Sequence, residues 1–201
     1  QRQMCIRDRA YTGRVEVLPL GKFKNKGDYS MGDLEGEEKP KLSVGFTAHY
    51  NDGAIRQRGQ TGRMLYEQRD LTSFFFDAIL KYNGWAFMSE YMSRSTDDPI
   101  TINEEGDIRY VYAGSGFFLQ GSYVFKSKWS LIGRLSFLDP VREISDFTDD
   151  IDEYAIGVTR YIKGHKLKVQ MDVAYEDRHN SYREQIVDDN WQIRFQVEIG
   201  I

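Results

Sequence analysis

Residues 190–201 end the chain with an unbroken alternation of apolar and polar side chains. The apolar set consists of Trp191, Ile193, Phe195, Val197, Ile199 and Ile201. The intervening set consists of Gln192, Arg194, Gln196, Glu198 and Gly200. Because successive side chains of a strand point to opposite faces of a sheet, the pattern predicts a β-strand with one apolar and one polar face.

The same alternation recurs along the chain and predicts about nine strands. Their approximate ranges are 11–19, 41–51, 70–82, 85–95, 109–125, 129–139, 153–162, 166–175 and 190–201. Most reach the ~9–11 residues that a tilted strand needs to cross a bilayer, whereas soluble strands more often span about five or six. The lengths therefore favour an all-β, antiparallel transmembrane β-barrel over a soluble sandwich, which produces the same alternation.

The connections between these strands are predicted to be alternately short and long. Asn83-Gly84 favours a type I′ turn because both residues accept a positive φ, and residues 126–128 and 163–165 are similarly tight. The long polar stretches are 52–69, 96–108, 140–152 and 176–189. Short periplasmic turns opposite long external loops are typical of outer-membrane barrels. Segment 21–40 departs from this pattern, and it holds either a small local structure or an unrecognised strand.

The composition argues against several other classes of protein. No run of about 18 apolar residues occurs, so no membrane-crossing helix is predicted. The formal net charge of -4 gives no basic footprint, so no nucleic-acid partner is expected. Cys5 is the only cysteine, which rules out an internal disulfide and a cysteine pair for a metal. Neither a metal nor a cofactor is expected.

Residues 1–9 are predicted to be a non-native leader. They contain neither the apolar core nor the small-residue cleavage site of a signal peptide, and they resemble adapter read-through at the end of assembled sequence. Residues 10–201 are predicted to be the C-terminal portion of one outer-membrane barrel domain, with the export signal and earlier strands upstream.

Aromatic residues concentrate near the predicted strand ends. Trp85 and Trp129 start strands directly after short turns, and Tyr82, Phe125 and Tyr161 end the partner strands. Rings at headgroup depth keep their bodies in lipid and their polar edges in water, so these residues predict an interfacial girdle. The alternative is the aromatic core of a sandwich.

Short motifs lie in a shared order from about residue 11 to the end. They are Gly13-Arg14-Val15-Glu16, Leu18-Pro19-Leu20-Gly21, Gly27-Asp28-Tyr29, Lys39-Pro40-Lys41-Leu42, Arg56-Gln57-Arg58-Gly59-Gln60, Asp97-Asp98-Pro99-Ile100 and Gly164-His165-Lys166-Leu167-Lys168-Val169-Gln170. Together they resemble the phosphate-selective porin O and P family, especially its Bacteroidetes-type members. The resemblance implies a homotrimeric channel of about sixteen strands, of which this chain holds slightly more than the C-terminal half. The terminal Ile201 departs from the family, which usually ends in Phe or Trp.

The functional residues of a porin line its lumen. By alternation, the inward-facing cations are Arg14, Lys81, Arg94, Arg134, Lys166, Lys168 and Arg194. The inward-facing acids include Glu16, Asp77, Glu90, Asp172 and Glu198. Such cations attract phosphate-like anions, and arginine offers a planar fork to two oxygens. The alternative is a solvated wall in which acids and cations form cross-strand ion pairs.

The loop after the second strand is the best candidate for a pore constriction. Its cations are Arg56, Arg58, Arg63 and Arg69, and its nearby acids are only Asp52 and Glu67. Folded into the channel, this loop forms an electropositive constriction; left outside, it pairs with lipopolysaccharide phosphates.

The other long loops are acidic. Their densest run is Asp146, Asp149, Asp150 and Asp152. This run either is a solvated loop or binds divalent cations between lipopolysaccharides, and it lacks the spacing of an EF-hand.

The sequence thus predicts a porin of the cell outer membrane for passive diffusion of small anions, with phosphate implied by the resemblance. Its expected partners are outer-membrane lipid and lipopolysaccharide, with small anions as permeant solutes. The alternative is a non-conducting structural or adhesion β-barrel. Catalysis is not expected, because His49, His165 and His179 are the only histidines and lie in no nucleophile or metal-binding motif.

Overall fold

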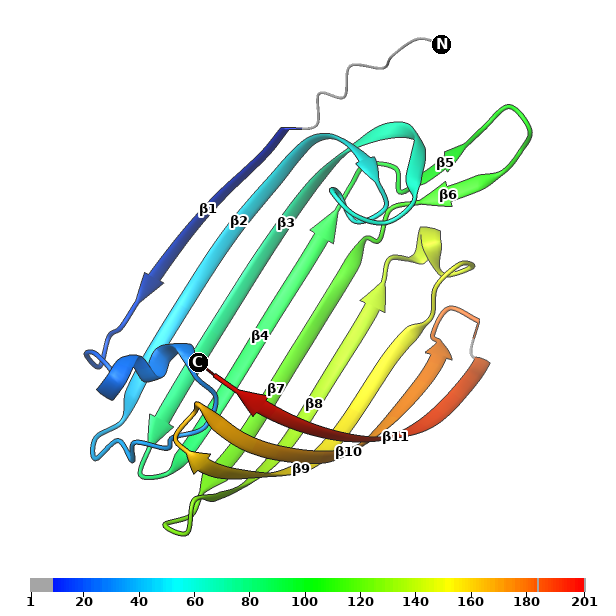
Figure 1. Ribbon diagram of the computed structural model, residues 1–201. Helices are drawn as coiled ribbons and strands as arrows, with labels where there is room; N and C mark the ends of the chain where they lie inside the picture. The colour runs from blue at the N-terminus through cyan, green and yellow to red at the C-terminus, as the bar shows by residue number, and fades with distance from the viewer. Residues whose placement is uncertain (1–8, 184, 201) are drawn as a thin grey trace.

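Nine strands form one antiparallel sheet in the part of the chain that the computed structural model describes, residues 9–183 and 185–200. In sheet order they are β1 (Arg9–Val17), β2 (Lys41–Arg56), β3 (Met64–Tyr82), β4 (Trp85–Ser95), β7 (Gly114–Val124), β8 (Trp129–Pro140), β9 (Asp150–Lys163), β10 (Leu167–Asn180) and β11 (Gln185–Ile199). Figure 1 shows the sheet curved into a trough with β1 and β11 at its two edges. The predicted all-β antiparallel fold is therefore confirmed, with an open, barrel-like sheet among the described strands.

Several predicted boundaries are wrong. The predicted strand 109–125 is two elements: β6 (Ile108–Tyr110) pairs with β5 (Ile100–Ile102) in a separate small sheet, and β7 follows. The break arises because the backbone between them bonds to loops: Val111 N–H donates to Pro99 O at 2.8 Å, and Tyr112 N–H donates to Gln57 O at 2.9 Å.

The long strands also shorten the predicted loops. β2 continues to Arg56, beyond its predicted end, and β3 begins at Met64, before its predicted start, which leaves residues 57–63 between them. Within the predicted leader 1–9, residues 1–8 lie outside the described residues and Arg9 begins β1. Ile201 also lies outside them, and β11 ends at Ile199.

The two faces of the sheet differ in polarity. Apolar and polar residues alternate along each strand, and the register pairs the apolar residues of one strand with those of the next. The convex face carries apolar side chains that stay exposed, such as Ile156 at 60% and Ile193 at 72%. Two rows of aromatic rings border it. The row near the short turns is Tyr82, Trp85, Tyr123, Phe125 and Trp129, and the row near the long loops is Tyr50, Tyr91, Phe117, Phe137, Tyr154, Tyr175 and Trp191. We call these two ends of the sheet the turn end and the loop end.

Tyr161 does not belong to the aromatic row at the turn end, contrary to its predicted place. It is 5% exposed and faces the concave side, where Lys168 is its register partner. Its neighbour Ile162 is 59% exposed. Alternation along β9 therefore turns Tyr161 inward.

Segment 18–40 is a local structure without a strand in its described residues, which is the first of the two predicted alternatives. It contains the 3₁₀ helix η1 (Lys24–Tyr29) and lies at the turn end of the trough (Figure 1). A second 3₁₀ helix, η2 (Arg142–Ile144), follows β8. None of the helical segments in the described ranges has the length and hydrophobicity of a transmembrane helix.

Candidate functional site

Most charges of the concave face form ion pairs between strands. Arg14 binds both carboxylate oxygens of Asp77, at 2.6 and 2.9 Å, and contacts Glu16 at 3.3 Å. The other pairs are Arg134–Glu153 at 2.6 Å, Arg194–Asp172 at 2.7 Å and Lys168–Glu198 at 2.9 Å. Register explains the last three pairs, since their partners lie on adjacent strands and point to the same side. Arg14 on β1 reaches Asp77 on β3 across Gly45 of β2, where a Cβ would lie 2.5 Å from both side chains. Each of these cations is thus largely balanced by a neighbouring carboxylate.

Arg94 and Lys166 differ from the paired cations of the concave face. Neither has a carboxylate within ion-pair distance among the described residues. The Nε of Arg94 donates to the hydroxyl of Ser73 at 3.1 Å. Lys166 is exposed in a turn, whereas Arg94 lies on β4 inside the trough.

The arginine loop, residues 57–63, folds over the concave face. At Gly59, where φ is +86°, a Cβ would lie 3.1 Å from the Asn51 amide and 3.7 Å from Leu71, two buried residues of that face. Figure 1 shows the loop curling across the trough at its loop end. Buried Ala54, Leu65, Leu71 and Val111 form an apolar cluster beneath it.

The four predicted constriction arginines do not act as one cluster. Arg56 donates to Gly62 O at 2.9 Å, and Arg63 is exposed. Arg69 pairs with Glu67 at 2.9 Å and Asp98 at 3.4 Å. Of the four, Arg58 lines a cavity of the concave face, and its guanidinium lies 5.1 Å from the centre of the Tyr112 ring.

Arg58 and Arg94 line one cavity of about 460 Å³ at the loop end. Ser73, Tyr112 and Thr148 add hydroxyl groups to the lining, which also includes Asp139 and apolar residues such as Phe75 and Ile144. We call this the two-arginine site. Sequence reasoning placed the two arginines in separate sets and overlooked Tyr112, because the predicted strand 109–125 hid the loop that carries it.

The acidic run of residues 146–152 is divided by the fold. Asp146 pairs with Arg183, and Asp150 is 3% exposed and accepts a hydrogen bond from Ser181 N–H at 2.7 Å. Asp152 lies on the convex side, opposite Phe137. Over the described ranges, no three potential metal-ligating side chains gather. The run is therefore not a single open acidic cluster.

Lys81 ties segment 18–40 to the concave face at the turn end. Lys81 is 2% exposed, and its ammonium donates to Ser30 O and Gly32 O, both at 2.7 Å, and to Ser30 Oγ at 3.2 Å. Buried Asp33 accepts hydrogen bonds from Gly84 N–H at 2.8 Å and Glu37 N–H at 2.9 Å. The predicted lumen cation Lys81 is thus a structural anchor.

Lys81→Met should release this segment while keeping the length of the side chain. The loss of three hydrogen bonds leaves the buried Gly32 and half-buried Ser30 carbonyl oxygens unpaired, at a cost of about 1–3 kcal/mol in the free energy of unfolding. Limited trypsin digestion should then cleave after Lys24 or Lys26 faster than in the unmodified protein. Lys166→Met is the matched control, because Lys166 is an exposed lysine of a turn at the same end of the sheet. Equal cleavage rates for both variants contradict the anchoring role.

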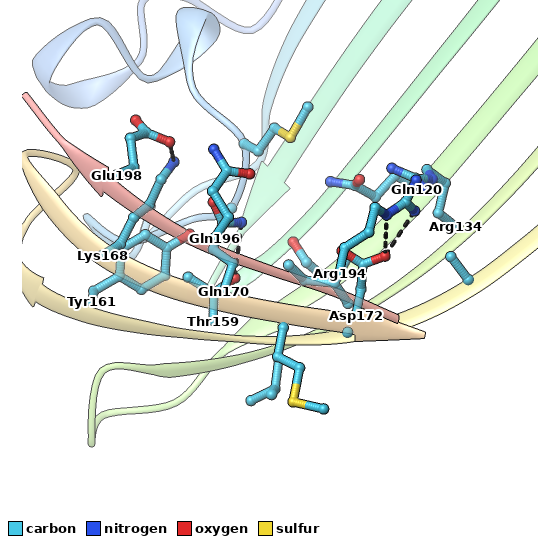
Figure 2. A pocket seen from close by; sticks show the side chains of 18 of the residues that line it. Gln120, Arg134, Thr159, Tyr161, Lys168, Gln170, Asp172, Arg194, Gln196 and Glu198 are labelled. Carbon is cyan, nitrogen blue, oxygen red and sulfur yellow. Dashed lines mark hydrogen bonds and ion pairs between the residues drawn. The ribbon is translucent and has the colours of Figure 1, made fainter. Parts of the chain in front are cut away.

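A second cavity, of about 630 Å³, lies between Tyr29–Gly32 and the concave face of β7 to β11. Figure 2 shows polar side chains from each of these strands around it. His165, in the adjacent turn, lines its edge, and burial, followed by repulsion from Lys168 and Lys81, lowers the pKa of His165 below its usual value. The imidazole is therefore neutral at pH 7.

Comparisons of this chain with protein-family models, with curated proteins and with solved structures found no match. The fold and the two cavities are therefore the basis for what we propose about its function.

Proposed function

We propose that this chain forms part of the wall of an outer-membrane β-barrel channel through which small anions, phosphate among them, diffuse passively. The polarity of the two faces of the sheet carries the proposal. A convex face of exposed apolar side chains surrounds a concave face of charged and polar ones. This is the arrangement of a barrel with lipid outside and water inside.

Lipid accounts for the convex face better than water does. Water-soluble proteins rarely expose contiguous apolar patches larger than a few hundred Å², whereas here such side chains extend from β1 to β11. Between Trp129 and Phe137, β8 advances roughly 27 Å at about 3.4 Å per residue. With a tilt of about 40° this spans roughly 20 Å, close to the ~25 Å apolar band of such barrels.

The two open edges of the sheet support a larger barrel. Among the described strands, β1 and β11 each pair with a single neighbour. A bilayer offers no partner for backbone N–H and C=O groups, so further strands must close the wall. The family resemblance suggests about sixteen strands in all and a homotrimer, with lipopolysaccharide around the loop end.

The two-arginine site supports a preference for anions. Arg58 and Arg94 lack a carboxylate partner in the described part of the chain, and both face the same cavity. Uncompensated guanidinium groups beside hydroxyl donors favour small oxyanions. The other charges of the concave face form ion pairs and therefore add little to the net electrostatic potential inside the channel.

Reconstitution of the full-length protein in a planar bilayer tests the proposal. We expect stepwise conductance and a reversal potential displaced toward the anion equilibrium potential in a salt gradient. A silent bilayer would instead favour a non-conducting structural or adhesion barrel. The inward-folded segment 18–40, which covers part of the concave face, is the observation in favour of that second candidate.

A further inference from the structure

We infer that the 630 Å³ cavity beneath residues 29–32 binds a neutral polyhydroxylated solute, a mono- or disaccharide, through uncharged amide and hydroxyl groups. This inference goes beyond the proposed anion pathway, although it shares the premise that the concave face lines a channel. It assigns the turn end a different ligand chemistry from the two-arginine site at the loop end.

The cavity has the size and enclosure of a small-molecule site. Its volume falls within the ~300–1,000 Å³ usual for such sites. Segment 18–40 forms one wall, held in place by Lys81, and the concave face of the sheet forms the other. Figure 2 shows Gln120, Gln170 and Gln196 reaching toward the same space from three different strands.

The charges that line this cavity are already neutralised by one another. Lys168 pairs with Glu198 at 2.9 Å, and Arg194 pairs with Asp172 at 2.7 Å. Arg134, the remaining arginine of the lining, pairs with Glu153 at 2.6 Å. The carboxylate beside each of these cations repels an incoming anion. A neutral solute can accept from the cations and donate to the acids without breaking the pairs.

The amide groups of the cavity have unused hydrogen-bonding capacity. Gln120 is 6% exposed, and its side-chain amide has no hydrogen-bond partner among the described residues. Buried Ser122 lies beside it, and Gln170 uses one N–H to reach the Thr159 hydroxyl at 3.2 Å. These amides line the cavity, where a ligand with both donors and acceptors can bond to them. The hydroxyl groups of a saccharide supply both.

Tyr29 adds an apolar surface to this polar set. It lines the cavity from segment 18–40 and is 78% exposed. The C–H face of a pyranose ring packs against an aromatic ring, while its hydroxyl groups bond to amides at the edge. An aromatic ring and several amides lining one cavity therefore suit a sugar better than an inorganic anion.

Calorimetric titration of the full-length, detergent-solubilised protein with maltose tests the site. We expect saturable binding, weakened about tenfold by either Gln120→Leu or Gln196→Leu, since each removes one set of hydrogen bonds. Tyr29→Ala should also weaken binding, and this exposed position poses no threat to folding. Gln192→Leu is the matched control, because Gln192 shares strand and face with Gln196 but does not line the cavity. It should bind maltose as the unmodified protein does.

Three results would overturn the inference: no saturable binding of maltose, equal affinities in all four variants, or displacement of bound maltose by inorganic phosphate. The calorimetric readout is independent of conduction. If the protein binds maltose but produces no conductance in a bilayer, the channel proposal is wrong and the saccharide site stands. A protein that conducts but does not bind maltose refutes only the site.

Discussion

Ile156→Arg is expected to lower the free energy of unfolding in a lipid bilayer by about 2–4 kcal/mol. Ile156 lies on β9, is 60% exposed on the convex face, and sits between the two aromatic rows. A guanidinium at that depth would lose its hydration to hydrocarbon. In water, the same change at so exposed a position would alter stability by only about 0.5 kcal/mol. Urea-induced unfolding in phospholipid vesicles measures the difference.

Gln192→Arg provides the control for this substitution. It introduces the same side chain on the concave face, and the expected change stays within about 0.5 kcal/mol. If Ile156→Arg proves as mild as the control, the convex face contacts water and the channel proposal is wrong.

The double substitution Arg58→Gln with Arg94→Gln is expected to reduce the anion-to-cation permeability ratio roughly threefold or more. These two guanidinium groups share one cavity and have no carboxylate partner in the described ranges, so their charge acts on the permeating ion. Glutamine keeps the hydrogen-bonding character and removes the charge. The shift of the reversal potential in a potassium chloride gradient measures the ratio.

Arg183→Gln is the control for the loss of charge at the loop end. Arg183 pairs with Asp146 outside the two-arginine site, so its removal should leave the ratio unchanged. An unaltered ratio in the double variant would exclude Arg58 and Arg94 as the selective residues. Equal shifts in the double variant and the control would point to the general charge of the loops.

The strands and their two faces could be predicted from the sequence because alternation is a local property. The bounds of β4, 85–95, were predicted as found, and the apolar sets of β2 and β10 lie together on the convex face. The separate strand β6 was missed because the alternation begins at Tyr110 and Tyr112, before the backbone rejoins the main sheet at Gly114. The local alternation of residue types shows to which face a side chain points. It does not show with which strand the backbone N–H of that residue forms its hydrogen bond.

The two candidate sites could be predicted only in part. The arginine loop and the inward cations were identified from residue type and alternation. Their division into paired and unpaired cations depends on contacts across the sheet, such as Arg14 with Asp77. The bond from Lys81 to Ser30 O joins residues far apart in the chain, and its acceptor is a backbone oxygen that every residue type carries.

By itself, the sequence determined an antiparallel sheet with one apolar and one polar face. Successive side chains of a strand point to opposite faces, so the alternation of residue types is enough to assign the two faces. Only the tertiary structure decided that segment 18–40 covers the turn end and that Arg58 and Arg94 line one cavity. Those outcomes depend on backbone hydrogen bonds and on the curvature of the sheet. Both bring distant segments together, and neither changes the local pattern of polar and apolar residues.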